Sequence, residues 1–212
     1  MTGAGGAGTI LDWARKVQAI AQNGLLYAHD PFDRERYTQL QVLVVSILGA
    51  ELDIPLGQVR DLWSHDEGYA TPKVDVRGGI FDADRVLLVR ERSDGKWTLP
   101  GGWVDVNDAP SSAVEREILE ESGYRARAVK LAALFDKNNP VHGHPPDVHH
   151  IYKLLFLCER TGGAPASSIE TDAVEFFPVR SLPPLSLGRT TPSQVERLYR
   201  HSLDKALPTD FD

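Results

Sequence analysis

Three glutamates occur within five residues, in the stretch REILEESG that runs from Arg116 to Gly123. Glu117, Glu120 and Glu121 are related as positions i, i+3 and i+4, which are neighbours on one face of a helix. Like charges so placed repel each other by about 0.2–0.5 kcal/mol per pair. Carboxylate oxygens suit Mg²⁺ and Mn²⁺, so a bound dication would relieve this repulsion. The spacing therefore predicts a divalent-metal site, and a solvated acidic helix face is the alternative for these three residues alone.

A helix over residues 107–123 is expected to position these carboxylates. Asn107 or Asp108 is the expected N-cap, Pro110 suits the first turn, and Gly123 ends the helix. On both sides of this helix, short apolar runs alternate with turn residues, which indicates strands. The sequence predicts strands over residues 74–82, 86–92, 97–104, 127–136, 149–159 and 173–179, and a closing helix over residues 191–203.

Helical spacing of apolar residues dominates the first seventy residues. Thr9 and Asp30 are expected to cap the first two helices, and the Asn-Gly pair at residues 23–24 is expected to end the first. The second helix is apolar almost all round, so we expect it to be buried. The predicted helices span residues 9–24, 30–52 and 55–63, and a polar linker follows over residues 64–73.

This order of elements, helices first and then mixed strands around a central helix, is typical of an α+β protein. We expect a helical N-terminal domain over residues 1–70, with a role in dimerisation or in the substrate pocket. A second domain is expected over residues 71–206. Residues 207–212 are expected to form an acidic tail.

The composition favours a globular protein of the cytoplasm. The longest apolar run, which begins at Leu40, is far shorter than the roughly 18 residues that suggest a membrane span, and the N-terminus lacks the basic start of a secretory signal. Cys158 is the only cysteine and is expected to be a buried strand thiol. The net charge of −7 argues against broad binding to nucleic acid. A small phosphorylated substrate bound through cations remains compatible with this charge.

The pattern around the three glutamates is longer than the helix. Gly102 is followed after five residues by Asp108, and after seven more by Arg116 and the glutamates, with Gly123 closing the motif. This pattern resembles the Nudix box, and the preceding LPGG agrees with it. One position departs, since Asp108 stands where the family has Glu. The resemblance covers roughly residues 73–202 and implies a Nudix α/β/α sandwich with a mixed sheet.

The resemblance implies metal-dependent hydrolysis of the pyrophosphate in a nucleoside diphosphate linked to another moiety, X. Mg²⁺ or Mn²⁺ is the implied cofactor, held by Glu117, Glu120 and Glu121 together with the carbonyl of Gly101. Arg116 is implied to pair with Asp108, with a structural role. Glu120 or Glu121 is the expected general base. The alternatives for the base, from flanking loops, are Glu170, Asp172 and His149.

Other polar and aromatic residues are candidates for contacts with the substrate. A histidine-rich loop, within residues 135–150, follows the fourth expected strand; it is too long for a simple connector, and four of the seven histidines lie in this stretch. It lacks a zinc spacing, so ligand contacts or plain loop polarity are the expectation there. Ordinary surface arginines and a core tryptophan are the alternatives elsewhere. The candidates are Arg90, Arg92, Trp103, Lys137, His144, His149, Lys153 and Glu170.

The helical N-terminal region resembles that of a Nudix subgroup that hydrolyses X-linked nucleoside diphosphates, including enzymes similar to CDP-choline pyrophosphatase. This resemblance implies cleavage of CDP-choline or a related nucleotide by a homodimer. ADP-ribose, nucleoside triphosphates and RNA ends are alternative substrates.

A function of another class also fits two domains. Residues 48–63 look like a helix-turn-helix, so the chain could be a DNA-binding regulator that uses its Nudix domain as a ligand sensor. Residues 1–70, however, contain five basic and nine acidic side chains. A DNA-binding domain is expected to be basic, so the charge favours the enzyme.

Overall fold

A computed structural model describes residues 9–52, 55–63 and 67–212. The chain divides into two compact units. One contains the N-terminal helices and Val148–His150, and the other contains Lys73–Asp147 and Ile151–Asp212. In the described part of the chain, no helix combines the length and the apolar character needed to cross a bilayer.

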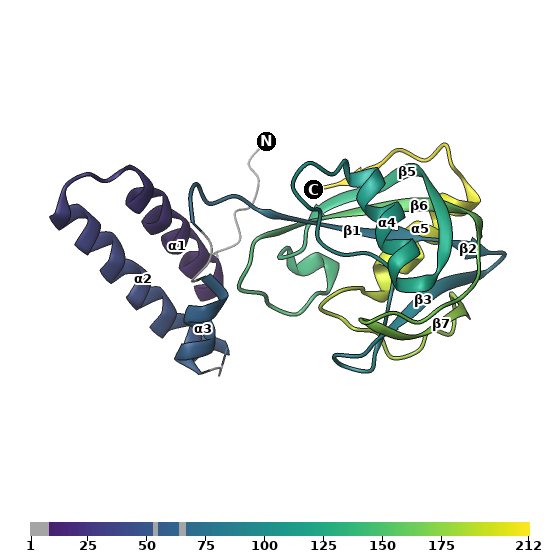
Figure 1. The fold of residues 1–212 in the computed structure, drawn as a ribbon, viewed down its shortest axis with the longest axis horizontal. Helices are drawn as coiled ribbons and strands as arrows, with labels where there is room; N and C mark the ends of the chain where they lie inside the picture. The colour runs from purple at the N-terminus through teal and green to yellow at the C-terminus, as the bar shows by residue number, and fades with distance from the viewer. Residues whose placement is uncertain (1–8, 53–54, 64–66) are drawn as a thin grey trace. The chain divides into compact units, whose positions relative to one another are not determined.

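The N-terminal unit contains three helices (Figure 1). Thr9 forms the expected N-cap, and its capping box with Asp12 is complete. Asp30 caps the second helix, where its Oδ1 accepts hydrogen bonds from the amides of Phe32 and Asp33 at 2.8 and 3.1 Å. The helices are α1 (Ile10–Tyr27), α2 (Pro31–Leu52) and α3 (Leu56–Trp63).

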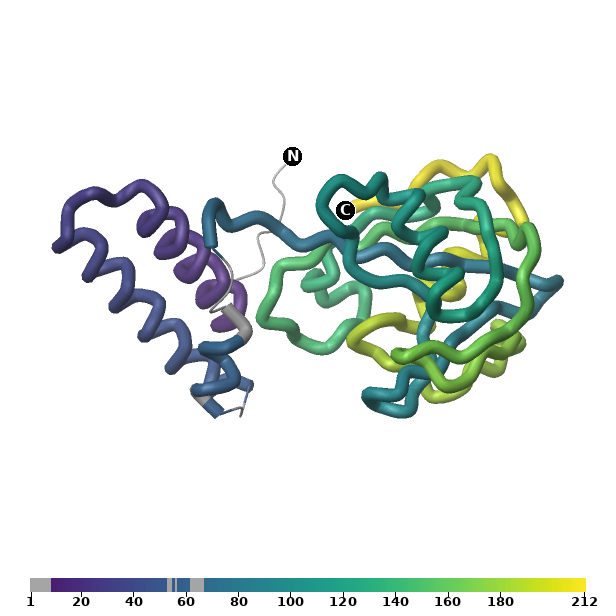
Figure 2. The backbone as a smooth tube through the Cα atoms, in the orientation of Figure 1, coloured from purple at the N-terminus to yellow at the C-terminus, as the bar shows by residue number. Residues whose placement is uncertain are grey.

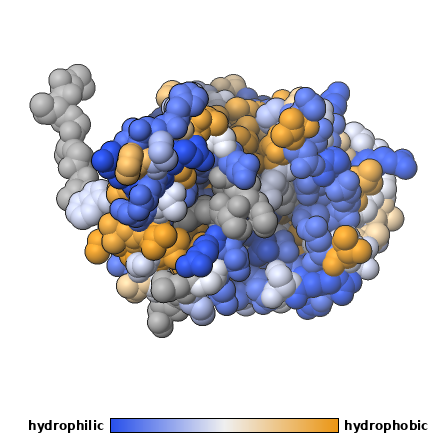
Figure 3. Space-filling model, turned by 60° about the vertical axis from the view of Figure 1, so that its left-hand side comes forward, coloured by the Kyte–Doolittle hydropathy of each residue, from blue (hydrophilic) through white to orange (hydrophobic). Residues whose placement is uncertain are grey.

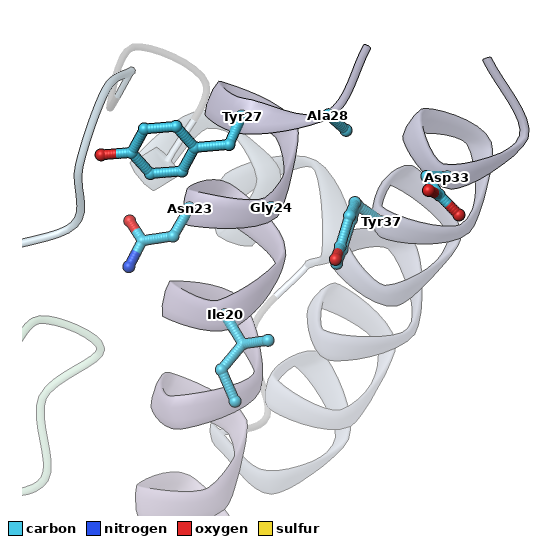
Figure 4. Close-up of a pocket in the computed structure, with 7 residues that line it drawn as sticks. All are labelled: Ile20, Asn23, Gly24, Tyr27, Ala28, Asp33 and Tyr37. Atoms are coloured by element: carbon cyan, nitrogen blue, oxygen red, sulfur yellow. The ribbon is translucent and has the colours of Figure 1, made fainter. Parts of the chain in front are cut away.

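The Asn-Gly pair does not end α1, which was the expectation. The helix continues to Tyr27. Gly24 instead allows a close helix contact, because a Cβ atom there would overlap with the ring of Tyr37 on α2. Figure 4 shows this ring beside α1. Asn23 also has a role of its own, since its Oδ1 accepts a hydrogen bond from the amide of Ala70 at 2.7 Å.

Helix α2 is not buried all round, so that expectation was wrong. Its buried residues are Val44, Val45 and Leu48, whereas Val42 and Leu43 are more than half exposed. Three helices alone form too small a unit to cover every side of a long helix. An apolar strip of α2 therefore faces away from the core of its own unit.

The second unit has two sheets (Figures 1 and 2). The first is mixed, with the order β1-β6-β5-β8; β6 is parallel to β1 and antiparallel to β5. In the second sheet, β2, β4 and β7 all pair antiparallel to β3. The strands are β1 (Lys73–Gly79), β2 (Phe81–Asp82), β3 (Arg85–Glu91), β4 (Trp97–Thr98), β5 (Tyr124–Asp136), β6 (Ile151–Gly163), β7 (Thr171–Pro178) and β8 (Asp210–Phe211).

Two helices cover opposite faces of the first sheet. Leu154 and Phe156 of β6 lie in one core with α4 (Pro110–Ser122), and Leu155 lies in another with α5 (Pro192–Leu203). Successive residues of a strand point to opposite faces, so this alternation places one helix on each side. In Figure 1, α4 lies in front of the sheet and α5 behind it. The expected α+β fold with a mixed sheet is confirmed.

Two local expectations are corrected. The N-cap of α4 is Ala109, not Asn107 or Asp108, and it makes no side-chain capping bond. Residues 207–212 are not a separate tail, because β8 pairs with β5 and Asp212 accepts a hydrogen bond from the amide of Asp136 at 2.8 Å. Gly123 does end α4, in the left-handed conformation that glycine favours.

Candidate functional site

Two glycines bring a backbone loop directly against the carboxylates of α4. Residues 100–104, the glycine loop, run beside β1. The carbonyls of Gly102 and Pro100 accept hydrogen bonds from the β1 amides of Val76 and Gly78, both at 2.9 Å. Gly101, with φ of +143°, approaches β1 so closely that a Cβ atom would overlap with the carbonyl of Val76. A Cβ atom at Gly102 would lie 3.0 Å from Oε2 of Glu117. The loop thus requires glycine at position 101, while at position 102 glycine leaves room for the Glu117 carboxylate.

Glu121 turns inward from α4 toward this loop. Its Oε2 accepts a hydrogen bond from the amide of Gly101 at 2.8 Å, and only 4% of the residue is exposed. Burial raises the pKa of Glu121 to about 8, against the lowering effects of Arg77 and of the Gly101 hydrogen bond. A carboxyl with such a pKa can exchange a proton near neutral pH.

Arg116 binds the remaining acidic side chains. One Nη donates to Glu117 at 2.8 Å and to Glu120 at 3.2 Å. The other donates to Asp105 at 3.3 Å and to Asp108 at 3.4 Å. The pair implied between Arg116 and Asp108 is therefore present but long, as the short aspartate side chain leads one to expect. Asp105 was not foreseen.

The three glutamates do not converge on one point, although their helical spacing predicts it. Glu121 faces Gly101, while Glu117 and Glu120 share Arg116. Within residues 9–52, 55–63 and 67–212, no group of three or more His, Cys, Asp or Glu side chains is arranged to hold a metal ion. The donors nevertheless suit a divalent metal in chemistry, since all are hard oxygens. Glu120 is largely exposed, so solvent screens its ion pair with Arg116 and little energy holds it.

A buried group of charges lies beside this loop; it joins Asp75 and Arg77, which were not foreseen, with the candidate Lys153. Arg77 of β1 donates two hydrogen bonds to Asp75, at 2.8 and 3.1 Å, and one to the carbonyl of Leu99 at 3.2 Å. Lys153 of β6, opposite Asp75 in the strand register, binds the same carboxylate at 2.5 Å. Burial raises the pKa of Asp75, but Arg77 and Lys153 outweigh it and lower the pKa to about 2. Charged residues two apart in the VDVRGG strand were the available signal.

Arg90 and Arg92 lie at the end of β3, beside the start of β7. Arg90 pairs with Asp172 at 2.7 Å, and Nε of Arg92 donates to the carbonyl of Ser168. The backbone carbonyl of Glu170 accepts from the amide of Arg92, which places this exposed glutamate beside the arginines. The hydrogen bond from Arg90 lowers the pKa of Asp172, which makes Asp172 a weaker base.

In the histidine-rich loop, His144 and Lys137 have hydrogen-bond or ion-pair partners within the protein. Nδ1 of His144 donates to the carbonyl of Leu187 at 2.7 Å, and its Nε2 accepts from Gln194 at 2.6 Å. Burial, with Lys153 and Lys137 nearby, lowers the pKa of His144 to about 4 despite the Leu187 carbonyl. Lys137 is buried against Asp147 at 2.5 Å. These contacts hold the loop and leave His144 neutral.

The remaining three candidates, Trp103, Lys153 and His149, differ in position. Trp103 forms an isolated bridge with Asp75, and 47% of it is exposed, so it is not a core aromatic. Lys153 is only 1% exposed, which places its ammonium group inside the protein. His149 lies in the Val148–His150 segment, which groups with the N-terminal helices.

The N-terminal unit has a pocket of about 440 Å³ between α1 and α2 (Figure 4). Tyr27, Tyr37 and Ile20 supply most of its aromatic and apolar lining, and Asp33 is its one acidic side chain. This lining offers few groups for acid–base or metal chemistry. The glycine loop and the carboxylates of α4 therefore remain the candidate active site.

Two family models match the chain. The model described as a UDP-X-like N-terminal oligomerisation domain matches residues 9–63, and the NUDIX domain model matches residues 71–198. Together they span both units, including the loop and α4.

Two of three similar known proteins match over nearly the whole chain. A Bacillus subtilis protein, YjhB, provisionally named an ADP-ribose pyrophosphatase, is 42% identical over 95% of this chain and 96% of its own. The crystal structure of a UDP-X diphosphatase has a TM-score of 0.62 and 31% identity, and covers 96% of this chain and 98% of its own. An ADP-ribose pyrophosphatase from Streptococcus suis has a TM-score of 0.60 and 39% identity, and covers 67% of this chain and 100% of its own.

Proposed function

The chain belongs to the Nudix hydrolase family and is a pyrophosphohydrolase, and from this premise we propose that its substrate is a nucleoside diphosphate linked to another moiety, X. Hydrolysis of the pyrophosphate releases a nucleoside monophosphate and phosphorylated X. The observation that carries the proposal is the glycine loop against α4, with the amide of Gly101 bonded to a buried Glu121.

Nudix hydrolases generally use divalent metals, and we propose Mg²⁺ or Mn²⁺ here. Glu117, Glu120 and Glu121 would hold the cation with the carbonyl of Gly101. When bound, the cation supplies neutralisation of the phosphate oxygens and activation of water. Glu117 and Glu120 are now paired with Arg116 of the same helix. They would coordinate the cation if the cation replaced Arg116 as their partner.

Glu121 is the proposed general base. Its carboxylate is held beside the loop by the hydrogen bond that Oε2 accepts from the Gly101 amide, in a position to take a proton from water. Glu120 is exposed and bound to Arg116, which favours a role as ligand. Asp172 is engaged by Arg90, so it is a poorer candidate, as is Glu170 on the exposed turn before it.

The proposed substrate class includes CDP-choline and related UDP-linked compounds. A protein described as a UDP-X diphosphatase resembles the chain over its N-terminal unit as well as its Nudix domain. The exposed ring of Trp103, which follows the two glycines in the same loop, suits stacking on a nucleobase. ADP-ribose is the second candidate, favoured by the names of the Bacillus and Streptococcus proteins.

A substrate screen tests the proposal. The protein is incubated with CDP-choline, UDP-glucose, ADP-ribose, ATP or a 5′-triphosphate RNA, with Mg²⁺ or Mn²⁺, and products are separated by chromatography. Release of a nucleoside monophosphate from a linked diphosphate is expected. Turnover of ATP or RNA alone would contradict the substrate class.

We further propose a homodimer formed through the N-terminal unit. The matching family model is that of an oligomerisation domain, and Val42 and Leu43 expose apolar side chains on α2. Apolar patches also reach the surface in Figure 3. Leu43→Glu is expected to shift the mass measured by light scattering to that of one chain, while Leu43→Met is not. This role leaves less support for the DNA-binding alternative, which a gel shift with genomic fragments would test.

A further inference from the structure

Arg77 is a buried arginine on β1 beside the glycine loop. Only 4% of it is exposed, and all three of its guanidinium nitrogens donate to described partners. Two of these bonds form a fork onto Asp75, and the third reaches the carbonyl of Leu99. A guanidinium does not lose its proton in a protein, so a positive charge is fixed at this point.

The charges around Arg77 include the carboxylates of the proposed site. Glu121 and Glu91 lie near enough to raise the pKa of Arg77 further, beyond the effect of Asp75 and against burial. Arg77 in turn lowers the pKa of Glu117 and Glu121, against the raising effect of burial on each. One guanidinium therefore faces acids from β1, β3 and α4.

Attachment of the loop alone does not explain Arg77. Backbone hydrogen bonds already join the loop to β1 at Val74, Val76 and Gly78. A buried ion pair is commonly no more stabilising than an apolar pair of similar size, because desolvation opposes it. The charge and the fork geometry are thus the features that need a reason.

We infer that Arg77 is a positioning residue for the proposed site: held by Asp75, it fixes the Leu99–Gly101 backbone through the Leu99 carbonyl, and so fixes the Gly101 amide that donates to Glu121. The catalytic part of this inference rests on the proposed function. The structural part does not, because the Gly101 amide and its bond to Glu121 can be followed in the absence of substrate.

The test compares Arg77→Lys and Arg77→Met with the native chain. Lysine keeps the charge but cannot form the fork, and methionine removes both. Hydrogen exchange of the Gly101 amide, followed by NMR in full-length labelled protein, is expected to quicken about 10-fold in Arg77→Lys and more in Arg77→Met. The turnover number is expected to fall about 10- to 100-fold in the same order, with KM changed less than about 3-fold.

Arg127→Met is the matched control, because Arg127 is an exposed arginine of the same unit, paired with Glu159. It should change neither readout. If Arg77→Met does not fold, Asp75→Asn serves in its place: it keeps Arg77 but weakens the fork, and a smaller effect of the same kind is expected. Melting curves show whether each variant is folded.

The outcomes separate the two proposals. Absence of turnover by the native chain on every linked diphosphate would defeat the proposed function, while the Gly101 exchange rates would still test Arg77. Native exchange at Gly101 and native turnover in Arg77→Lys would overturn the inference. So would a uniform increase in exchange along β1 with no selective effect at Gly101, because that is the signature of a merely structural ion pair.

Discussion

Two segments of the second unit concentrate potential ligands, and they use them differently. Three glutamates of α4 gather with Asp105 and Asp108 of the preceding segment around Arg116 and the glycine loop, and Glu120 is open to solvent. In the histidine-rich loop, both ring nitrogens of His144 bind residues outside the loop, and the ammonium group of Lys137 binds Asp147 within it. Residue type alone therefore does not define a site, because a ligand must also be free to exchange its partner.

The largest expected effect is that of metal removal. Chelation of divalent cations should abolish turnover, and added Mg²⁺ or Mn²⁺ should restore it. Without the cation, no positive charge lies between the carboxylates and the substrate phosphates. Calorimetry with Mn²⁺ measures which of the two regions binds the metal. Uptake should be weakened in Glu117→Gln and unchanged in His144→Asn; the reverse result would place the metal in the loop.

Glu121→Gln should reduce the turnover number by about 10²- to 10⁴-fold, the usual contribution of a general base. The amide keeps an oxygen for the Gly101 hydrogen bond, so the circular dichroism spectrum should not change. Glu196→Gln, on the exposed face of α5, is the control. Near-native turnover in Glu121→Gln would remove Glu121 from its proposed role.

Trp103→Ala should raise KM by about 5- to 100-fold, which corresponds to the loss of one base–aromatic stack worth about 1–3 kcal/mol. The turnover number should change little, because the ring does not reach the reacting atoms in this proposal. Trp103→Phe should restore most of the affinity. Steady-state kinetics on the best substrate measures both variants, and an unchanged KM in Trp103→Ala would exclude stacking.

The smallest effect is a pH-dependent loss of stability through His144. The folded protein holds His144 neutral, with its pKa lowered from 6.5 to about 4, whereas the unfolded chain takes up a proton near pH 6.5. The contribution to stability is therefore complete above pH 6.5 and is lost as pH falls toward 4. At most about 3 kcal/mol is involved, and partial exposure of the ring reduces this to about 1–2 kcal/mol.

Urea unfolding at pH 7 and pH 4.5 measures this effect. The difference in the free energy of unfolding should be smaller in His144→Ala than in the native chain. Turnover at pH 7.5 should stay within about 3-fold of native. A large loss of turnover with native stability would make His144 part of the site. It would contradict the distinction between the carboxylates of α4 and the histidine-rich loop.

Much of the site's framework could be predicted from the sequence because its determinants are local. The end of α4 at Gly123 and the buried Cys158 follow from turn chemistry and from an apolar strand, and the mixed sheet follows from the resemblance to the Nudix family. The cap of α4 could not be predicted, because Asp108 is directed to Arg116 instead. That choice depends on a tertiary contact.

The buried charges could not be predicted for a similar reason. Asp75 and Lys153 are 78 residues apart and meet only through the parallel register of β1 and β6. Helical spacing correctly places three glutamates on one face of α4, but it does not show that Glu121 turns toward the Gly101 amide. The loop that supplies this amide is fixed by its pairing with β1, which a sequence pattern does not reveal.

The missing side chain at Gly102 makes an experiment on distance alone possible. An alanine methyl group there would stand 3.0 Å from Glu117, close enough to displace the carboxylate by a few tenths of an ångström. Neither the charge of Glu117 nor its position on α4 would change. The steepness with which the reaction rate responds to so small a displacement would measure the mechanical tolerance of the catalytic machinery.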